Sequence, residues 1–328
     1  MFINERTKPH ELIYYEALSA RTSLMKKESA KFENVKKGYE GEMLYDQIFD
    51  SIGHGNVLIY RDLFLSIDGS VTQYDTLIIS DIGIISNEIK NFSGSVTFRD
   101  GSWYRGNFAI PNDAFSQLNR SVGKLMELRN TSRSDFKVSG KLIFPNDNFT
   151  FHSDDQSNWN KIILRSGLRD YFRQFNQSGI VAGNKAQYIS WLISSSIVEN
   201  PYFKPAVDKT RLKFGLYCGR CGSFNLSKKR FHLTCNKCGS TECNETHLLR
   251  AMNDYKFLFY NQPMTRNSLL EFIDYDLHFK AVSRALLKHC YTNNKGTRTT
   301  YTFKYFDFED AVNKSDAYMR YKDHIPMI

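Results

Sequence analysis

The chain has 328 residues, enough for two or three domains of ordinary size. Its composition, 41% hydrophobic and 24% charged, is normal for a soluble globular protein, and no apolar run approaches the roughly 18 residues of a membrane span. The net charge is +9, and the whole excess lies in residues 201–328. A surplus confined to one region favours a polyanion as its partner, although charge by itself fits a merely soluble surface equally well.

The first fifteen residues carry charges where a secretory signal would have an apolar core. We therefore expect a cytoplasmic protein that does not bind a membrane. Six cysteines in such a reducing compartment bind a metal more often than they form disulfides.

The hydrophobic pattern of the first half predicts alternating helices and strands. We expect an exposed helix over 10–32, a helix over 36–52, strands over 56–65, 72–80 and 83–90, a hairpin near 96–103, a helix over 112–130 beginning at Asn112 or Asp113, a strand over 137–145, and helices over about 157–175 and 183–197. This order predicts an α/β (α+β) fold with a mixed central sheet of αβββαβ order flanked by helices. It would occupy 36–200, between a helical segment at 1–35 and a linker at 201–214.

Acidic and basic residues gather where two of these strands end. Glu88 and Lys90 face the same side of their strand, and Asp75 lies on the preceding strand with Gln73 beside it. A loop of two or four residues would place Asp75 opposite Glu88, whereas a three-residue loop would put them on opposite faces. Two carboxylates so close repel unless a cation lies between them, and their hard oxygens suit Mg²⁺ or Mn²⁺. Taken alone, Glu-x-Lys on a strand is more often a solvated face.

The combined pattern resembles the nuclease-related domain, NERD, of the PD-(D/E)xK restriction-endonuclease-like superfamily, over roughly 36–130. The matching residues are Gly41-Glu42, Gln73-Tyr74-Asp75, the run Gly83 to Asn91, and Gly94. The resemblance implies that Asp75 and Glu88 bind a catalytic metal, that Lys90 assists the attacking water, and that Glu42 contributes from the helix. It also implies a secondary role for Gln117. Tyr74 and Ser86-Asn87 depart from the apolar residues common in the family, but the acidic and basic positions are intact.

Four cysteines follow in two C-x-x-C pairs: Cys218, Cys221, Cys235 and Cys238. Four thiolates at this spacing suit tetrahedral Zn²⁺, and a site filled by protein ligands is structural, so we expect a zinc ribbon over 215–245. Cys243 and His247 are expected to be bystanders, and Cys290 to be buried in a helix.

The positive surplus suggests two nucleic-acid contacts in the second half. One is the loop between the cysteine pairs, with Lys228, Lys229 and Arg230. The other is the basic side of a helix over 276–290, with Lys280, Arg284 and Lys288, together with a turn and strands that carry Lys295 and Arg298. Helices over 246–260 and 265–274 precede it, and the order in 246–328 resembles a winged helix. Both basic groups could equally be solvated faces.

These features favour a metal-dependent nuclease acting on nucleic acid, an endonuclease for DNA, with the zinc ribbon and basic region for targeting. One alternative is a nucleic-acid-binding regulator without catalytic activity. Another is a subunit of a defence or repair complex. Self-association and a protein partner stay open.

Overall fold

The computed structural model describes residues 2–111, 113–260, 262–295, 298–315 and 320–325. The chain forms two compact units. Unit 1 comprises Met1–Lys8 and Glu33–Tyr202, and unit 2 comprises Pro9–Phe32 and Phe203–Ile328. Within the described residues, no helix is both long enough and apolar enough to cross a membrane.

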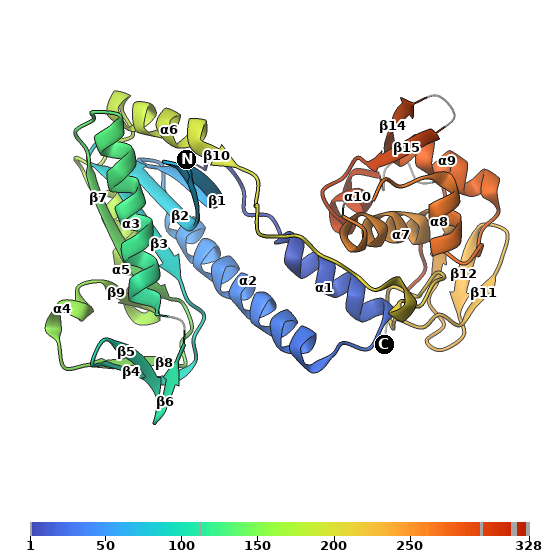
Figure 1. The fold of residues 1–328 in the computed structure, drawn as a ribbon, viewed down its shortest axis with the longest axis horizontal. Helices are drawn as coiled ribbons and strands as arrows, with labels where there is room; N and C mark the ends of the chain where they lie inside the picture. The colour runs from blue at the N-terminus through green and yellow to red at the C-terminus, as the bar shows by residue number, and fades with distance from the viewer. Residues whose placement is uncertain (1, 112, 261, 296–297, 316–319, 326–328) are drawn as a thin grey trace. The chain divides into compact units, whose positions relative to one another are not determined.

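Unit 1 is built on a six-stranded sheet with the order β10-β1-β2-β3-β7-β9 (Figure 1). Its elements in chain order are α2 (Lys26–Ile52), β1 (Leu58–Ile67), β2 (Ser70–Ser80), β3 (Gly83–Ile89), α3 (Ala114–Thr131), β7 (Lys137–Phe144), β9 (Ile162–Leu164), α6 (Asn184–Ser196) and β10 (Ile197–Val198). From β10 through β1 and β2 to β3, each strand is antiparallel to the next. From β3 through β7 to β9, each strand is parallel to the next. The predicted mixed sheet and αβββαβ order are confirmed.

Helices cover both faces of this sheet. On one face, α2 and α5 (Leu168–Arg173) bury Tyr45, Phe49 and Phe172 against the strands. On the other face, α3 and α6 contribute Leu125 and Ile189 to a separate cluster. Successive side chains of a strand point to opposite faces, so the continuous apolar run of β2 supplies both clusters.

Two short turns set the strand register. Asp68-Gly69 joins β1 to β2, and both residues have left-handed φ angles (46° and 70°), as a two-residue type I′ turn requires. Asp81-Ile82 joins β2 to β3, with Ser80 paired to Gly83. Gly83 has φ 152°, and a Cβ atom there would lie 1.9 Å from the Lys137 carbonyl oxygen, so only glycine permits β7 to pair so closely.

A second, four-stranded sheet of order β6-β5-β4-β8 is inserted around α3. It consists of β4 (Gly94–Arg99), β5 (Ser102–Arg105), β6 (Phe108–Ile110) and β8 (Phe149–Ser153). Strands β4 and β5 form the predicted hairpin. Helix α3 then begins at Ala114, and its N-cap is Asp113, whose side chain accepts a hydrogen bond from the Phe115 amide at 2.9 Å.

Two helix predictions are wrong. The expected exposed helix over 10–32 is α1 (His10–Arg21) followed by the start of α2 at Lys26, and α1 is not exposed, because Leu12 and Leu18 are buried in the core of unit 2. The expected helix over 157–175 is interrupted. It consists of α4 (Gln156–Trp159), β9, the 3₁₀ turns Arg165–Gly167 and Gln174–Asn176, and α5. The run Ile162-Ile163-Leu164 pairs with β7 as an edge strand of the sheet.

Unit 2 combines a small sheet with a helical bundle. The sheet contains β11 (Leu226–Lys228), β12 (His232–Cys235) and β13 (Thr241–Cys243). The helical part contains α7 (Asn244–Leu258), α8 (Arg266–Phe272), α9 (Phe279–His289), the hairpin β14 (Cys290–Lys295) and β15 (Arg298–Phe303), and α10 (Phe308–Ser315); a 3₁₀ turn, Lys209–Arg211, precedes the cysteines. Leu18, Leu233, Leu249 and Leu286 belong to one core, so α1, the small sheet and the bundle fold together.

The order of helix, helix and hairpin predicted for 246–328 is present. Met264, between α7 and α8, forms an additional bridge with Tyr301 of β15, which adds a third strand segment to the hairpin. One detail of the prediction is wrong. Cys290 is buried but starts β14 instead of lying in a helix.

A buried ion pair joins α1 to α7 within unit 2. Arg21 Nε donates to Asp254 Oδ2 at 2.8 Å, and both side chains are at most 3% exposed. Arg21 Nη1 also donates to the carbonyl oxygens of Lys213 and Gly215. The segment before the first cysteine pair is thereby fixed to the helices.

Candidate functional site

The β2–β3 hairpin brings two of the predicted site residues together. The last pair of the β2–β3 ladder is Thr76 with Asn87, and Asp75 and Glu88 are the next residues along their strands. The loop has two residues, so the even-length condition is met. Lys90 Nζ donates to Glu88 Oε1 at 2.7 Å, and the Ile89 amide donates to Asp75 Oδ2 at 2.7 Å. Each carboxylate therefore has a second oxygen that could coordinate a cation.

Glu42 lies on α2 at this end of the sheet. It is bound there by Arg6, which the sequence prediction did not include. Arg6 Nη1 donates to Glu42 Oε2 at 2.6 Å, and Arg6 Nη2 donates to the Asp75 carbonyl oxygen at 2.9 Å. The Arg6 side chain is only 1% exposed. It thus links the helix that carries Glu42 to the strand that carries Asp75.

Arg6 is the first of two arginines that lie between the acidic side chains spaced along α2. Asp46, one turn after Glu42, accepts a hydrogen bond from Arg6 Nε at 2.7 Å, and its other oxygen lies 3.2 Å from Arg61 Nε of β1. Arg61 Nη2 in turn contacts Asp50 at 2.7 Å. Acidic residues four apart on a helix repel one another, and the two arginines relieve that repulsion.

Burial and mutual repulsion raise the pKa values of two site carboxyls. Burial, together with the negative charge of Asp75, raises the pKa of Glu42 to about 8 against the opposing effect of Arg6. The same two causes raise the pKa of Glu88 to about 7, although Lys90 opposes them. A divalent cation would relieve this repulsion, which is consistent with a metal site.

The pKa of the basic partner Lys90 is raised as well. Burial would lower the pKa of Lys90, but the charges of Glu88 and Asp75 outweigh it and raise that pKa above its ordinary value. Lys90 is therefore an ammonium ion that can donate to a substrate oxygen or orient a water.

The two predicted glutamines lie in different surroundings. Gln73 is exposed, and its Nε2 donates to Asp62 Oδ1 at 2.9 Å. Burial raises the pKa of Asp62, a further carboxyl that the sequence prediction did not include. Gln117 lies in the first turns of α3, and its Oε1 is buried without a hydrogen-bond partner among the described residues.

The carboxylates do not yet converge as closely as the ligands of an assembled metal site. Among the described residues, the four cysteines are the only group of three or more acidic, histidine or cysteine residues whose donor atoms all lie within 4.8 Å of one another.

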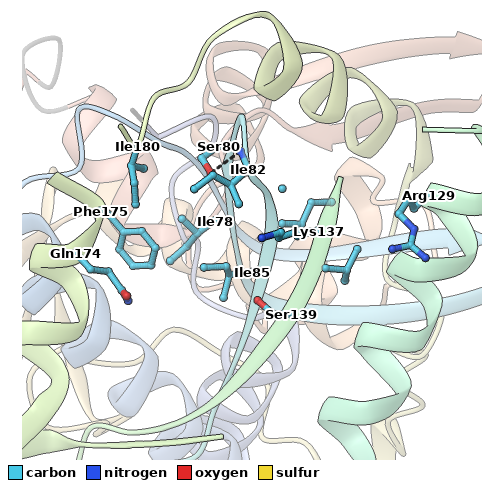
Figure 2. A pocket seen from close by; sticks show the side chains of 13 residues that line it. Ile78, Ser80, Ile82, Ile85, Arg129, Lys137, Ser139, Gln174, Phe175 and Ile180 are labelled. Carbon is cyan, nitrogen blue, oxygen red and sulfur yellow. Dashed lines mark hydrogen bonds between the residues drawn. The ribbon is translucent and has the colours of Figure 1, made fainter. Parts of the chain in front are cut away.

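A cavity of about 480 Å³ lies at the opposite end of β2 and β3, beside the Asp81-Ile82 turn (Figure 2). It is lined mainly by apolar side chains, including Ile78, Ile85 and Phe175. None of the predicted site residues lines it. The expected site is thus the carboxylate cluster, and not this cavity.

Comparison with known protein families bears on the carboxylate cluster. The family model of the nuclease-related domain, NERD, matches residues 37–145. These residues form a NERD domain. The match runs from α2 to the end of β7 and contains Glu42, Asp75, Glu88 and Lys90. No curated protein and no solved structure matches the chain significantly.

Beyond the NERD domain, the four cysteines of unit 2 converge as predicted. The Sγ atoms of Cys218 and Cys238 lie 3.6 Å apart, and those of Cys221 and Cys235 lie 3.5 Å apart. A tetrahedral site with Zn–S distances of about 2.3 Å has edges of about 3.8 Å. The cluster could therefore bind Zn²⁺, and the adjoining three-stranded sheet fits a zinc ribbon. Cys243 lies outside the cluster, and its Sγ contacts Thr246.

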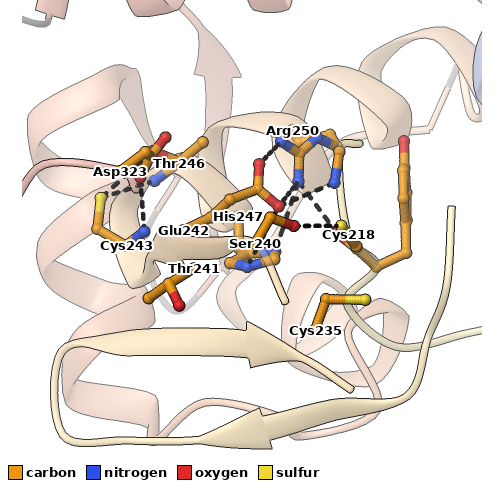
Figure 3. A network of polar contacts seen from close by, with 12 residues as sticks. Cys218, Cys235, Ser240, Thr241, Glu242, Cys243, Thr246, His247, Arg250 and Asp323 are labelled. Carbon is orange, nitrogen blue, oxygen red and sulfur yellow. Dashed lines mark hydrogen bonds and ion pairs between the residues drawn. The ribbon is translucent and has the colours of Figure 1, made fainter. Parts of the chain in front are cut away.

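A buried polar network connects the first cysteine pair to α7 (Figure 3). Glu242 Oε2 accepts a hydrogen bond from the Gly219 amide at 2.8 Å, and Glu242 also pairs with Arg250 of α7. Arg250 Nη1 donates to the Tyr217 carbonyl oxygen at 3.1 Å. The backbone on both sides of Cys218 is thereby fixed to a helix of the bundle.

The basic loop between the cysteine pairs is exposed. Lys228, Lys229 and Arg230 all have exposed side chains. Lys228 Nζ lies 2.8 Å from Asp276 Oδ1, so part of its charge is compensated. The Arg230 guanidinium lies 4.9 Å from the centre of the Phe231 ring, a combination of charge and exposed ring that suits contact with nucleic acid.

The basic side of α9 is also exposed, at Lys280, Arg284 and Lys288. Lys288 pairs with Glu245 at 2.6 Å, so Lys280 and Arg284 are the stronger candidates for phosphate contacts. Lys295 and Arg298 are paired in the β14–β15 hairpin, but their side chains lie outside the described residues.

Proposed function

We propose that the NERD domain is a nuclease that hydrolyses phosphodiester bonds, with DNA as its substrate and Mg²⁺ or Mn²⁺ as its cofactor. The observation that carries the proposal is the β2–β3 register. Asp75 and Glu88 directly follow its last pair, Thr76 with Asn87; Lys90 Nζ lies 2.7 Å from Glu88, and Arg6 binds Glu42 of α2. Such a collection of acids around one lysine is costly to bury, and the match to a nuclease-related family supports a catalytic reason for it.

Asp75 and Glu88 would hold the cation. Their oxygens are hard ligands, and the raised pKa of Glu88 reflects its burial and, second, repulsion by Asp75, which a bound cation would offset. When bound, a cation of this kind lowers the pKa of a coordinated water and offsets charge on the phosphate.

The other residues would act on the substrate and the water. Lys90, kept protonated by its acidic neighbours, would donate to a phosphate oxygen or orient the water for attack. Gln117 offers a buried carbonyl oxygen that has no hydrogen-bond partner in the described part of the chain, and it could orient a water or a substrate group at this end of the sheet. Glu42 would complete the acidic surroundings from α2, and Gln73 would position Asp62.

A cleavage assay tests this proposal directly. Purified full-length protein is incubated with supercoiled, linear and single-stranded DNA and with RNA, in Mg²⁺ or Mn²⁺ and with a chelator. We expect metal-dependent cleavage of DNA. Glu88→Gln and Lys90→Ala should each lower the rate by at least about two orders of magnitude, typical for loss of a catalytic group.

Lys141→Ala is the matched control for Lys90→Ala. Lys141 lies on the adjacent strand β7, paired with Asn87, so its side chain faces the side of the sheet opposite to Glu88. It should cleave like the wild type. Equal activity of Glu88→Gln and wild type would place the active site elsewhere. Metal-independent binding without any cleavage would instead favour the non-catalytic regulator.

The zinc ribbon and α9 would direct the nuclease to its substrate. All of the net positive charge lies beyond residue 200, and the exposed cations of α9 and of the β11–β12 loop both belong to unit 2. Phosphate contacts of this kind position a protein on nucleic acid without reading its sequence. We therefore propose that unit 2 supplies affinity and that the NERD domain supplies the cleavage.

A further inference from the structure

The N-terminal segment before α1 is an ordered part of unit 1. Phe2 forms a parallel bridge with Ile59, and the Ile3 amide donates to the Ile59 carbonyl oxygen at 2.9 Å. Asn4 exchanges two hydrogen bonds with the backbone of Arg61, at 2.6 and 2.9 Å. Residues 2–4 thus cover the edge of β1 beyond the part that pairs with β10, whose partners are Phe64 and Leu65.

This docking delivers Arg6 to the end of the sheet where the site lies. All three guanidinium nitrogens of Arg6 are used: Nε binds Asp46, Nη1 binds Glu42, and Nη2 binds both the Asp75 carbonyl oxygen and Thr76 Oγ1. The rigid planar fork of arginine can hold several acceptors at fixed angles, which the single ammonium group of lysine cannot do. One side chain therefore fixes a helix and a strand relative to each other.

The two elements joined by Arg6 carry the proposed catalytic groups. Glu42 accepts from Arg6 directly, whereas Asp75 is held through its backbone, which leaves its carboxylate for the site. Without Arg6, Glu42 would face the Asp75 charge without a counter-ion, and burial would favour its turning toward solvent. The contact that the Arg6 guanidinium makes between α2 and the end of β2 would also be lost.

We propose that Arg6 is a positioning residue of the nuclease: it holds Glu42 and the β2 backbone at Asp75 in the arrangement that cleavage needs. The inference rests on the proposed function. Arg6 touches no substrate in this scheme, and it acts through the residues that do.

The test compares full-length Arg6→Ala and Arg6→Lys with Arg61→Ala. Arg61 is the matched control, because it is similarly buried and binds Asp46 and Asp50 in the same charge series along α2. Its guanidinium also lies on the Phe2 ring, but it touches neither Glu42 nor Asp75. With all variants folded, Arg6→Ala should lower kcat by about 100-fold at little change in KM, the effect expected of misplaced groups. Arg6→Lys should recover part of the loss, and Arg61→Ala should stay within about threefold of the wild type.

Hydrogen–deuterium exchange provides a readout that does not depend on activity. Amides of 74–77 and 87–90 should exchange faster in Arg6→Ala than in Arg61→Ala. If the wild type cleaves nothing, the proposed function fails, and the exchange comparison still decides whether Arg6 holds this end of the sheet. Equal losses of kcat and equal exchange in Arg6→Ala and Arg61→Ala would overturn the inference, because both arginines would then be merely structural. Should Arg6→Ala not fold, Arg6→Lys must still lower kcat by about tenfold, or the inference is wrong.

Discussion

Glu242→Gln should weaken zinc binding although Glu242 is not a ligand. Its carboxylate accepts from the Gly219 amide inside the first cysteine pair and pairs with Arg250, and both side chains are at most 8% exposed. Replacing the carboxylate by an amide leaves a buried guanidinium without its counter-ion. The full cost of such a change to the free energy of unfolding is about 3–5 kcal/mol. Because the site forms only when this backbone is folded, part of that cost appears as lost zinc affinity.

The expected loss of affinity is about 10–100-fold, the usual effect of removing a residue that supports a metal site from outside. This corresponds to about 1.4–2.7 kcal/mol, so less than the full cost reaches the metal. The assay is competition for zinc against a chromophoric chelator of known affinity, at fixed pH and salt.

Glu245→Gln is the control for this prediction. Glu245 makes the same kinds of contact, with Lys288 and His289, but none with the cysteine pairs. It should bind zinc like the wild type within about twofold, since its contacts lie outside the metal's supporting network. The reasoning is refuted if Glu242→Gln and Glu245→Gln release zinc to the chelator equally.

Three further predictions concern unit 2. Elemental analysis should find one zinc per wild-type chain and none in Cys235→Ser, and zinc retained by this variant would contradict the four-cysteine site. In urea unfolding, Arg21→Met should cost about 3–5 kcal/mol because Asp254 stays buried without its partner, whereas Arg21→Met/Asp254→Leu should lie near the wild type; equal loss in both would rule out the ion pair as the cause. Replacing Lys280 and Arg284 with alanine should flatten the salt dependence of duplex DNA affinity by about 1.8 logarithmic units, measured by fluorescence anisotropy, and an unchanged slope would assign the contact to the β11–β12 loop.

The sequence by itself determined the features that arise from neighbouring residues. Strand periodicity places Glu88 and Lys90 on one face of β3, but the length of the turn before them, which decides whether Asp75 shares that face, was settled only by the structure. The convergence of the four cysteines follows from two C-x-x-C pairs, since each pair positions two sulfurs on one turn. The capping chemistry of Asn112 and Asp113 marked the start of this helix to within one residue, and Asp113 is the N-cap of α3.

The tertiary structure alone decided which distant segments serve these features. The spacing of Glu42, Asp46 and Asp50 signals that α2 needs basic partners, but nothing local identifies Arg6 and Arg61 as those partners. Helix α1 had no visible partner in the sequence, so it was expected to be exposed, whereas it is buried in unit 2. The segment at 162–164 is a strand because it pairs with the free edge of β7. In each case the deciding contact joins residues far apart in the chain, and periodicity and capping carry no information about such pairs.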